Sequence, residues 1–205
     1  MKSLQPGRLG IFGGTFDPIH VGHLIIAEEM ADRLALDRVL FLPAARPPHK
    51  TDQEVSPNVD RATMVELALA GHPRFAVSYV DMTRSGPSYT ADSLETLQQE
   101  HPTETLHFLM GQDSLRDLPT WHDPNRIARQ ALLGVALRPS VTVDVESIVR
   151  QVPDAAGRIT LVEVPLIQIA SRTIRERVRD GRPIRYQVPG AVERYIRRRG
   201  LYRTP

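Results

Sequence analysis

Gly13-Gly14-Thr15-Phe16-Asp17-Pro18-Ile19-His20-Val21-Gly22-His23 lies between a short apolar run, Arg8–Phe12, and a segment with the apolar spacing of a helix, Gly22–Leu36. The two glycines allow the backbone to turn sharply and to approach a ligand closely. Exposed backbone amides and a helix N-terminus then form a site that favours anions, to which Thr15 can add a hydroxyl. Because His20 and His23 are three residues apart, both rings can face that site. The stretch predicts a strand, a ligand-binding loop and a helix in succession.

Each part of this stretch also has an ordinary interpretation. Two glycines after a strand are common in turns, and two histidines three residues apart are often surface residues or half of a metal site. The order of strand, Gly-Gly-Thr, Asp-Pro, His-x-Gly-His and helix is far more specific than any of its parts. We therefore interpret the whole stretch as an anion-binding loop.

Strand-like and helical patterns alternate along the rest of the chain. Strands are predicted at Arg38–Leu42, Phe75–Val80, Thr105–Met110, Ala131–Leu137 and Arg158–Val164, and helices at Val59–Ala70, Thr90–Gln99, Ser171–Asp180 and Gly190–Arg199. The alternation predicts an α/β fold, with a doubly wound, mostly parallel sheet and helices on both faces. In such sheets ligands bind beyond the carboxyl ends of the strands. The proline-rich stretch Pro43–Pro57 is predicted to be a functional loop at that end.

The composition is that of an ordinary globular protein. The 205 residues, 41% of them hydrophobic and 24% charged, suffice for one large domain with a full apolar core. Without cysteine, the chain cannot use disulfides, thiolate nucleophiles, cysteine-bound zinc or iron–sulfur clusters. No apolar run approaches the roughly 20 residues that span a bilayer, and Met1–Gly7 lacks the apolar stretch of a signal peptide. We expect a cytoplasmic protein with no membrane partner.

The charge is unevenly distributed along the chain. The net charge is +2, but Ser171–Pro205 holds 11 arginines and 3 acidic residues, whereas lysine occurs only at Lys2 and Lys50. The arginines are either solvated helix faces or the binding surface for a negatively charged partner, a nucleic acid or a phosphate-bearing small molecule.

Four later segments place polar and aromatic groups near strand or helix ends. They are Phe41-Leu42-Pro43-Ala44-Ala45-Arg46-Pro47-Pro48-His49-Lys50, Gly86-Pro87-Ser88-Tyr89-Thr90-Ala91-Asp92-Ser93-Leu94, Gly111-Gln112-Asp113-Ser114-Leu115 with Leu118 and Trp121, and Ile169-Ala170-Ser171-Arg172-Thr173-Ile174-Arg175. Together with residues 13–23 they resemble the bacterial nicotinate-nucleotide adenylyltransferases, of the nucleotidyltransferase superfamily with the His-x-Gly-His motif. The resemblance extends from Arg8 to Tyr202.

The resemblance implies a Rossmann-like fold and an activity. A single domain, residues 1–205, would have a sheet-containing nucleotide-binding core at 8–165 and a basic C-terminal helical region at 166–205. The enzyme would transfer the adenylyl group of ATP to nicotinate mononucleotide, giving nicotinate adenine dinucleotide and pyrophosphate. Such transfers need in-line positioning and charge compensation rather than a covalent enzyme intermediate. Mg²⁺ would accompany ATP, since it shields phosphates and takes few protein ligands.

The resemblance also implies roles for individual residues. Those implied in catalysis are His20, His23, Lys50 and Arg175. Those implied in ATP binding are Gly13, Gly14, Thr15, Phe16, His20, His23, Gly111, Asp113, Arg138, Ser171 and Arg175. Those implied in mononucleotide binding are Lys50, Tyr89, Thr90, Trp121 and His122. No protein ligand for a metal is expected.

Several of these residues have structural alternatives. An isolated tryptophan such as Trp121 is more often packed in a core. Asp113 and Ser171 are each suited to be a helix N-cap, and Lys50 could be a solvated loop charge. The chain also departs from the family pattern at three places. Arg172 interrupts the small hydroxyl residues around Ser171, and Ser140 follows the Arg-Pro pair where a glycine is common. His122 stands where a tyrosine is frequent.

Other functions are compatible with parts of the sequence. The same chemistry could use nicotinamide mononucleotide or another phosphorylated acceptor. A nucleic-acid-binding module could use the basic C-terminal region, but that region has few aromatic residues and no recognised nucleic-acid motif, so no nucleic-acid partner is expected. A relative that binds nucleotide without catalysis is a third alternative, and a homo-oligomer is possible.

Overall fold

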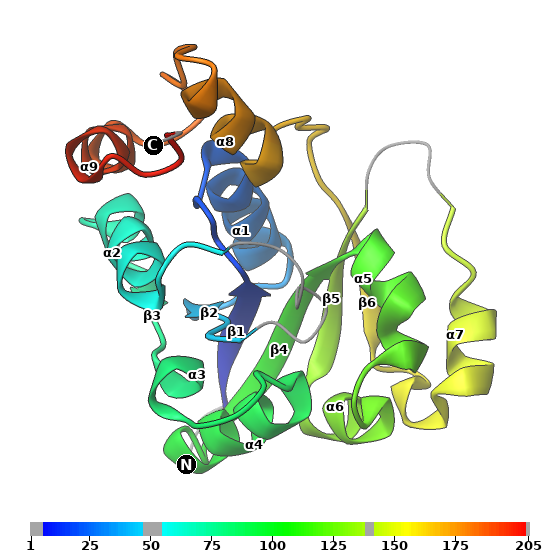
Figure 1. Ribbon diagram of the computed structural model, residues 1–205. Coiled ribbons are helices and arrows are strands. Elements are labelled where there is room, and N and C mark those ends of the chain that lie inside the picture. The colour runs from blue at the N-terminus through cyan, green and yellow to red at the C-terminus, as the bar shows by residue number, and fades with distance from the viewer. Residues whose placement is uncertain (1–5, 47–54, 138–141, 204–205) are drawn as a thin grey trace.

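One parallel sheet organises the chain in a computed structural model, which describes residues 6–46, 55–137 and 142–203. The strand order is β3-β2-β1-β4-β5-β6, and every neighbouring pair is parallel (Figure 1). The strands are β1 (Gly7–Gly14), β2 (Arg38–Pro43), β3 (Phe75–Val77), β4 (Glu104–Gly111), β5 (Leu132–Leu137) and β6 (Ile159–Glu163). The α/β prediction and the existence of all six strands are confirmed.

Nine α-helices and two short 3₁₀ helices lie within the described ranges. They are α1 (Val21–Arg33), α2 (Asn58–Leu69), α3 (Val80–Thr83), α4 (Thr90–Glu100), α5 (Gln112–Asp117), α6 (Pro124–Gln130), α7 (Val145–Gln151), α8 (Ser171–Arg179) and α9 (Gly190–Arg199), with η1 (Leu118–Thr120) and η2 (Pro153–Ala155). The five predicted helices are present. The predicted strand Phe75–Val80 is too long, because pairing with β2 ends at Val77 and Val80 begins α3.

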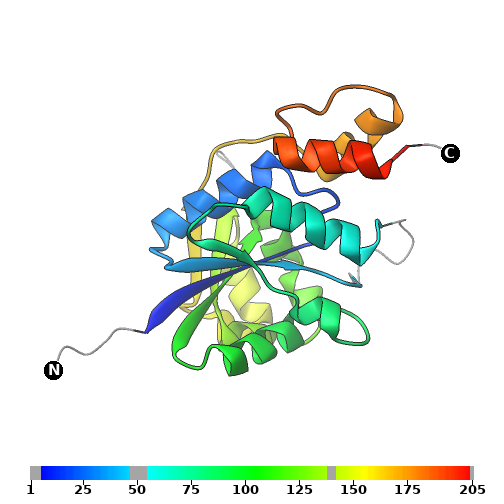
Figure 2. The same cartoon turned by 90° about the vertical axis from the view of Figure 1, so that its left-hand side faces the viewer.

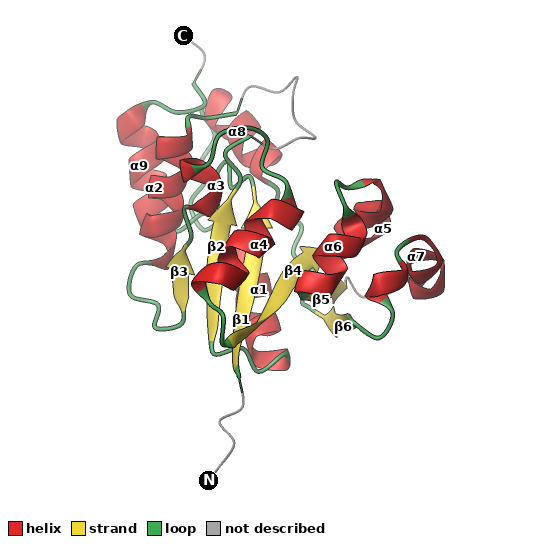
Figure 3. Cartoon of the chain, turned by 90° about the horizontal axis from the view of Figure 1, so that it is seen from below, coloured by secondary structure: helices red, strands yellow, loops and turns green. Residues whose placement is uncertain are grey.

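The two faces of the sheet carry two apolar clusters. In β4, Leu106 and Phe108 belong to one cluster and Leu109 to the other, as the alternation of side chains along a strand requires. Helices α1 and α2 cover one face, and α8 and α9 pack beyond them on the same side (Figure 2). Helices α4 to α7 cover the opposite face, where α4 and α6 cross in front of the strands in Figure 3.

A glycine on β5, Gly134, allows the end of α1 to pack closely against the sheet. A Cβ at Gly134 would lie 2.7 Å from Leu34 Cδ1 and 3.1 Å from Met30 Cε, both buried. We therefore expect Gly134→Ala to lower the free energy of unfolding by about 1–3 kcal/mol, the usual cost of overpacking. Urea titration measures this cost. Thr160→Ala, at the exposed β6 position paired with Gly134, is the matched control and should change stability little; equal losses in both variants would contradict the packing argument.

Among the described residues, no helix is both long enough and apolar enough to cross a membrane.

Candidate active site

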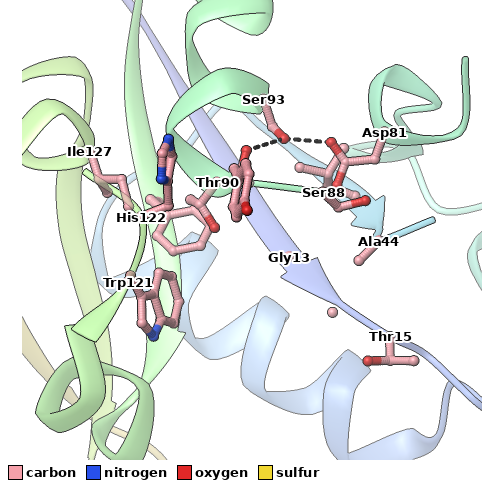
Figure 4. A pocket seen from close by; sticks show the side chains of 14 residues that line it. Gly13, Thr15, Ala44, Asp81, Ser88, Thr90, Ser93, Trp121, His122 and Ile127 are labelled. Atoms are coloured by element: carbon pink, nitrogen blue, oxygen red, sulfur yellow. Dashed lines mark hydrogen bonds between the residues drawn. The ribbon is translucent and has the colours of Figure 1, made fainter. Parts of the chain in front are cut away.

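The strand order reverses between β1 and β4, so the crossovers leave a crevice at the carboxyl ends of these two strands. A cavity of about 240 Å³ lies there, beside the loop that joins β1 to α1 (Figure 4). Its lining comes from the ends of β1, β2 and β4, from α3, α4 and α6, and from the loops beside them. The lining residues are Gly13, Gly14, Thr15, Leu42, Ala44, Asp81, Ser88, Tyr89, Thr90, Ser93, Phe108, Trp121, His122 and Ile127. Segments far apart in the sequence thus meet at the place that the fold predicts for a ligand.

His20 and His23 form a reciprocal cap at the N-terminus of α1. The backbone N–H of His23 donates to His20 Nδ1 at 3.3 Å, and the backbone N–H of His20 donates to His23 Nδ1 at 3.2 Å. The two rings are stacked, with centroids 3.6 Å apart and planes 18° apart. Because each Nδ1 accepts a hydrogen bond, a neutral ring carries its proton on Nε2. The cap therefore fixes the tautomer of two neighbouring hydrogen-bond donors.

The His20 ring is only 6% exposed. Burial penalises the charged imidazolium and lowers the pKa of His20 to about 4. At neutral pH the ring is uncharged, so it can donate a hydrogen bond from Nε2 but holds no second proton to give up.

A buried arginine on α2 is hydrogen-bonded to the loop between β1 and α1. The Arg61 guanidinium, 0% exposed, donates to the backbone carbonyls of Thr15 at 2.7 Å, Ser56 at 3.0 Å and Ala45 at 3.3 Å. Burial lowers the pKa of Arg61 from its ordinary value. One side chain thereby ties the β1–α1 loop to both ends of the β2–α2 connection. The sequence contains no local signal for this role, since Arg61 is one arginine among many on a helix.

Asp17 also connects segments that are distant in the sequence, through hydrogen bonds to Ser56 and Tyr202. Its carboxylate, 3% exposed, accepts hydrogen bonds from the backbone N–H of Ser56 at 3.1 Å and from the Tyr202 hydroxyl at 2.7 Å. Burial and the neighbouring Asp17 charge raise the pKa of Tyr202, so its hydroxyl remains a donor. Neither residue was assigned a site role from the sequence.

The structure brings Ser171 and Arg175 to the same loop. Ser171 Oγ donates to the Pro18 carbonyl at 2.8 Å, and Arg175 donates to the Asp17 carbonyl at 2.7 Å. The N-cap of α8 is Ala170, so the alternative that Ser171 is the N-cap is wrong. Helix α8 thus reaches the β1–α1 loop through two side chains.

Four of the five predicted mononucleotide residues, Tyr89, Thr90, Trp121 and His122, line the cavity. Tyr89 stacks on His122, with centroids 4.2 Å apart, and Trp121 meets Phe108 edge-on at 6.1 Å. Trp121 is half-buried against the apolar cluster and also lines the cavity, so it contributes to the core and its role in mononucleotide binding stays a prediction. Thr90 is the first residue of the 11-residue helix α4, where backbone amides favour a negative group.

The remaining predicted residues do not line the cavity or lie outside the described part of the chain. Gly111 is the N-cap of α5 at the end of β4, and Asp113 lies in the first turn, 3.3 Å from Arg116, so Asp113 is not the N-cap that the sequence allowed. Phe16 is 2% exposed and packs against His23. Lys50 and Arg138 lie outside the described residues.

Comparison with known proteins gives a consistent result. The profile of the cytidylyltransferase-like family matches residues 11–177. The chain is 62% identical, over 96% of its length and 92% of the relative, to a "probable nicotinate-nucleotide adenylyltransferase" of Thermomicrobium roseum. It is 45% identical, over 98% of its length and all of the relative, to a protein of that description from a Roseiflexus species.

A solved structure supports the fold independently. The Plasmodium falciparum nicotinic acid mononucleotide adenylyltransferase complexed with NaAD is similar with a TM-score of 0.78 over 96% of this chain and 97% of that one, at 19% identity. At this level of identity the similarity concerns the fold.

Proposed function

The chain belongs to the nicotinate-nucleotide adenylyltransferases of the cytidylyltransferase-like family, and we propose from its site how it performs their reaction. The enzyme transfers the adenylyl group of ATP to nicotinate mononucleotide, giving nicotinate adenine dinucleotide and pyrophosphate in NAD biosynthesis. A phosphate oxygen of the mononucleotide attacks the α-phosphorus of ATP, a new P–O bond forms, and the bond to the bridging oxygen breaks. Pyrophosphate leaves with the electron pair.

The observation that carries the mechanism is the reciprocal histidine cap at the start of α1, on the loop whose first residues line the cavity. Two Nε2–H groups held by the backbone can donate to the ATP phosphates as negative charge moves onto the leaving pyrophosphate. Because their positions are fixed before the substrate binds, little reorganisation is needed in the transition state. Gly13, Gly14 and Thr15 bring backbone amides to the same place.

Several further residues complete the proposed ATP site. Ser171 donates to the Pro18 carbonyl and Arg175 to the Asp17 carbonyl. Both side chains are proposed to turn toward the β- and γ-phosphates when ATP binds. Asp113, with Gly111 before it, is proposed to accept a hydrogen bond from a ribose hydroxyl. Lys50 and Arg138 are proposed to add charge on the basis of their motifs alone. Phe16 supports the loop through its packing against His23.

Magnesium is proposed to enter with ATP. When bound, it would reduce the negative charge of the phosphates, and it ordinarily keeps several waters. The donor set supports this proposal, because the described residues offer hydroxyls, amides and an arginine for the triphosphate that would carry the ion.

The pyridine ring of the acceptor is proposed to bind in the cavity. Trp121 and the Tyr89–His122 stack provide flat apolar surfaces, and the start of α4 at Thr90 provides donors for the carboxylate. A site built for a carboxylate disfavours the neutral amide, because donors would remain unpaired. This supports the acid as the acceptor.

Replacement of Trp121 tests the acceptor pocket. We expect Trp121→Ala to raise the KM for nicotinate mononucleotide by about tenfold or more, the loss of roughly 1.4 kcal/mol of ring contact, with a smaller change in the KM for ATP. Steady-state kinetics with each substrate varied in turn gives both values. Equal rises in the two KM values would instead indicate a purely structural role.

The activity itself is tested with ATP, Mg²⁺ and either nicotinate or nicotinamide mononucleotide. Chromatography and pyrophosphate release should show dinucleotide from the acid with the much higher kcat/KM. A preference for the amide would leave the chemistry intact and overturn the acceptor. Absence of product from both would overturn the proposed mechanism.

The organisation of the chain is proposed to be a single domain. Ile174 of α8 and Val192 and Ile196 of α9 belong to the same apolar cluster as α1 and α2, which supports residues 166–205 as a part of the core domain. A cytoplasmic location and a homo-oligomer stay predictions, and size-exclusion chromatography with light scattering tests the second.

A further inference from the structure

The deep end of the cavity contains a carboxyl group that sequence reasoning did not assign. Asp81 of α3 lines the cavity and is 4% exposed, and Ser88 and Ser93, 8% and 0% exposed, lie beside it (Figure 4). These three polar residues share the space proposed for the acceptor ring and its carboxylate. A fixed negative charge here is unexpected in a pocket that selects an anion.

The hydrogen bonds around Ser93 suit two protonation states of Asp81. Ser93 Oγ forms a short hydrogen bond with Asp81 Oδ1 and lies 3.0 Å from the Tyr89 carbonyl. A hydroxyl has only one proton. When Asp81 is ionised, Ser93 donates to it. When Asp81 is protonated, Asp81 donates to Ser93 Oγ and the Ser93 proton turns to the Tyr89 carbonyl. Each state leaves these groups hydrogen-bonded.

The charges around Asp81 nearly balance. Arg84, at the end of α3, lies 3.7 Å from Asp81 Oδ1 and also 3.4 Å from Asp92 of α4, which is itself paired with Arg126 of α6. His122 lies on the other wall of the cavity, and β2 contributes apolar Leu42. Burial raises the pKa of Asp81, and the hydrogen bond from Ser93 and the Arg84 charge act in the opposite direction. The carboxyl is therefore poised to respond to one more charge.

We propose that Asp81 determines the response of the enzyme to the acid and amide forms of the acceptor: Asp81 takes up one proton from solvent when the acid binds and stays ionised when the amide binds. The inference rests on the proposed function, since it assumes that the pyridine ring enters this cavity. Two carboxylates enclosed in one small cavity repel each other, and protonation of Asp81 removes the repulsion. The neutral amide imposes no such requirement, and its N–H₂ can donate to an ionised carboxylate.

The proposal predicts a pH dependence of selectivity. The ratio of the KM for nicotinate mononucleotide to the KM for nicotinamide mononucleotide should rise by up to about tenfold per pH unit. The rise starts at the pKa of Asp81 in the free enzyme and levels off at its higher pKa in the complex. Both acceptors carry the same phosphate, so its ionisation cancels in the ratio. The measurement is steady-state kinetics with saturating ATP from pH 5.5 to 8.5.

Two variants identify the group that titrates. Asp81→Asn imitates the protonated carboxyl, so the ratio should become independent of pH and the acid should bind at high pH as it does at low pH. Ser93→Ala removes a hydrogen bond that favours the carboxylate, so the rise should start at higher pH. Glu95→Gln is the matched control, because Glu95 also lies on α4 but pairs with Arg126 outside the cavity lining. It should leave the ratio and its pH dependence unchanged.

Specific outcomes would overturn the proposal. A ratio that does not change with pH in the parent enzyme, or one that keeps its pH dependence in Asp81→Asn, would show that Asp81 does not take up the proton. Because the Asp81→Asn and Ser93→Ala variants change a buried network, thermal melts accompany the kinetics and Ser93→Ala provides an independent result. Failure of the proposed function is distinguishable, since neither acceptor would then give dinucleotide at any pH.

Discussion

His20→Ala should lower kcat by about 10²–10³-fold, the usual effect of removing one preorganised donor from a developing negative charge. The neutral ring donates from Nε2, and its position is fixed by the hydrogen bond from the His23 backbone to Nδ1. The free energy of unfolding should fall much less, by about 0.5–2 kcal/mol for the lost cap. Steady-state kinetics and urea titration on the same preparation separate these two effects.

Two further variants sharpen this test. Asn is a good N-cap, so His20→Asn should retain stability and still lose most of the rate. His72→Asn is the matched control. His72 lies outside the cavity lining and its Nε2 is 3.0 Å from a carboxylate oxygen of Glu28, so the kcat of this variant should equal that of the parent. A folded His20→Ala enzyme with the parent kcat would remove His20 from the mechanism.

The stability of the parent should also depend on pH through His20. The folded-state pKa is about 4, below the ordinary value of 6.5, so between these values the unfolded chain binds more protons than the folded one. Stability from this residue is complete above pH 6.5 and is lost as the pH falls toward 4, by about 3 kcal/mol in all. Urea titrations at pH 4.5 and 7 should show a smaller difference for His20→Asn than for the parent.

Arg61→Met should lower the free energy of unfolding by about 3–5 kcal/mol, the expected cost of removing the charged partner from a buried polar network. Met has a similar apolar stem, so the loss comes from the guanidinium. The partly buried carbonyls of Thr15, Ala45 and Ser56 would lose the donor that the fully buried guanidinium provides. Because these carbonyls belong to segments at the cavity, kcat should fall as well.

Arg172→Met is the control for Arg61→Met. Arg172 is 83% exposed and pairs with Glu176 at 3.0 Å on the surface of α8, so its removal should cost at most about 0.5 kcal/mol. Thermal or urea unfolding compares the two directly. Similar losses in both variants would mean that the buried guanidinium is not the anchor of the loops.

Strands β1, β2, β4 and β5 are predictable because their central apolar residues are buried on both faces of a parallel sheet. Helices α3, α5, α6 and α7 have only 4 to 7 residues, which is too short for a helical period to show. Two of them nevertheless carry start signals that could have been used, since the side chains of Asp123 and Asp144 cap α6 and α7, and Pro124 follows Asp123.

Some residues of the candidate site are likewise predictable from the sequence and others are not. His20 and His23 are neighbours in the sequence, so their meeting at a helix start follows from the motif. Arg61 is 46 residues from its partner Thr15, and Asp81 meets Ser93 only because α3 and α4 pack together. No local pattern encodes such contacts, which depend on the assembled sheet.

The hydrogen bond between Asp17 and Tyr202 joins residues 185 positions apart. Closing so long a loop is unfavourable in entropy until the intervening strands are in place, so this contact should form late in folding. The β1–α1 loop then takes its final shape only after the sheet beneath it. Local opening of the segment that follows α9 would release that loop first, and amide exchange near Asp17 should be faster than in the central strands.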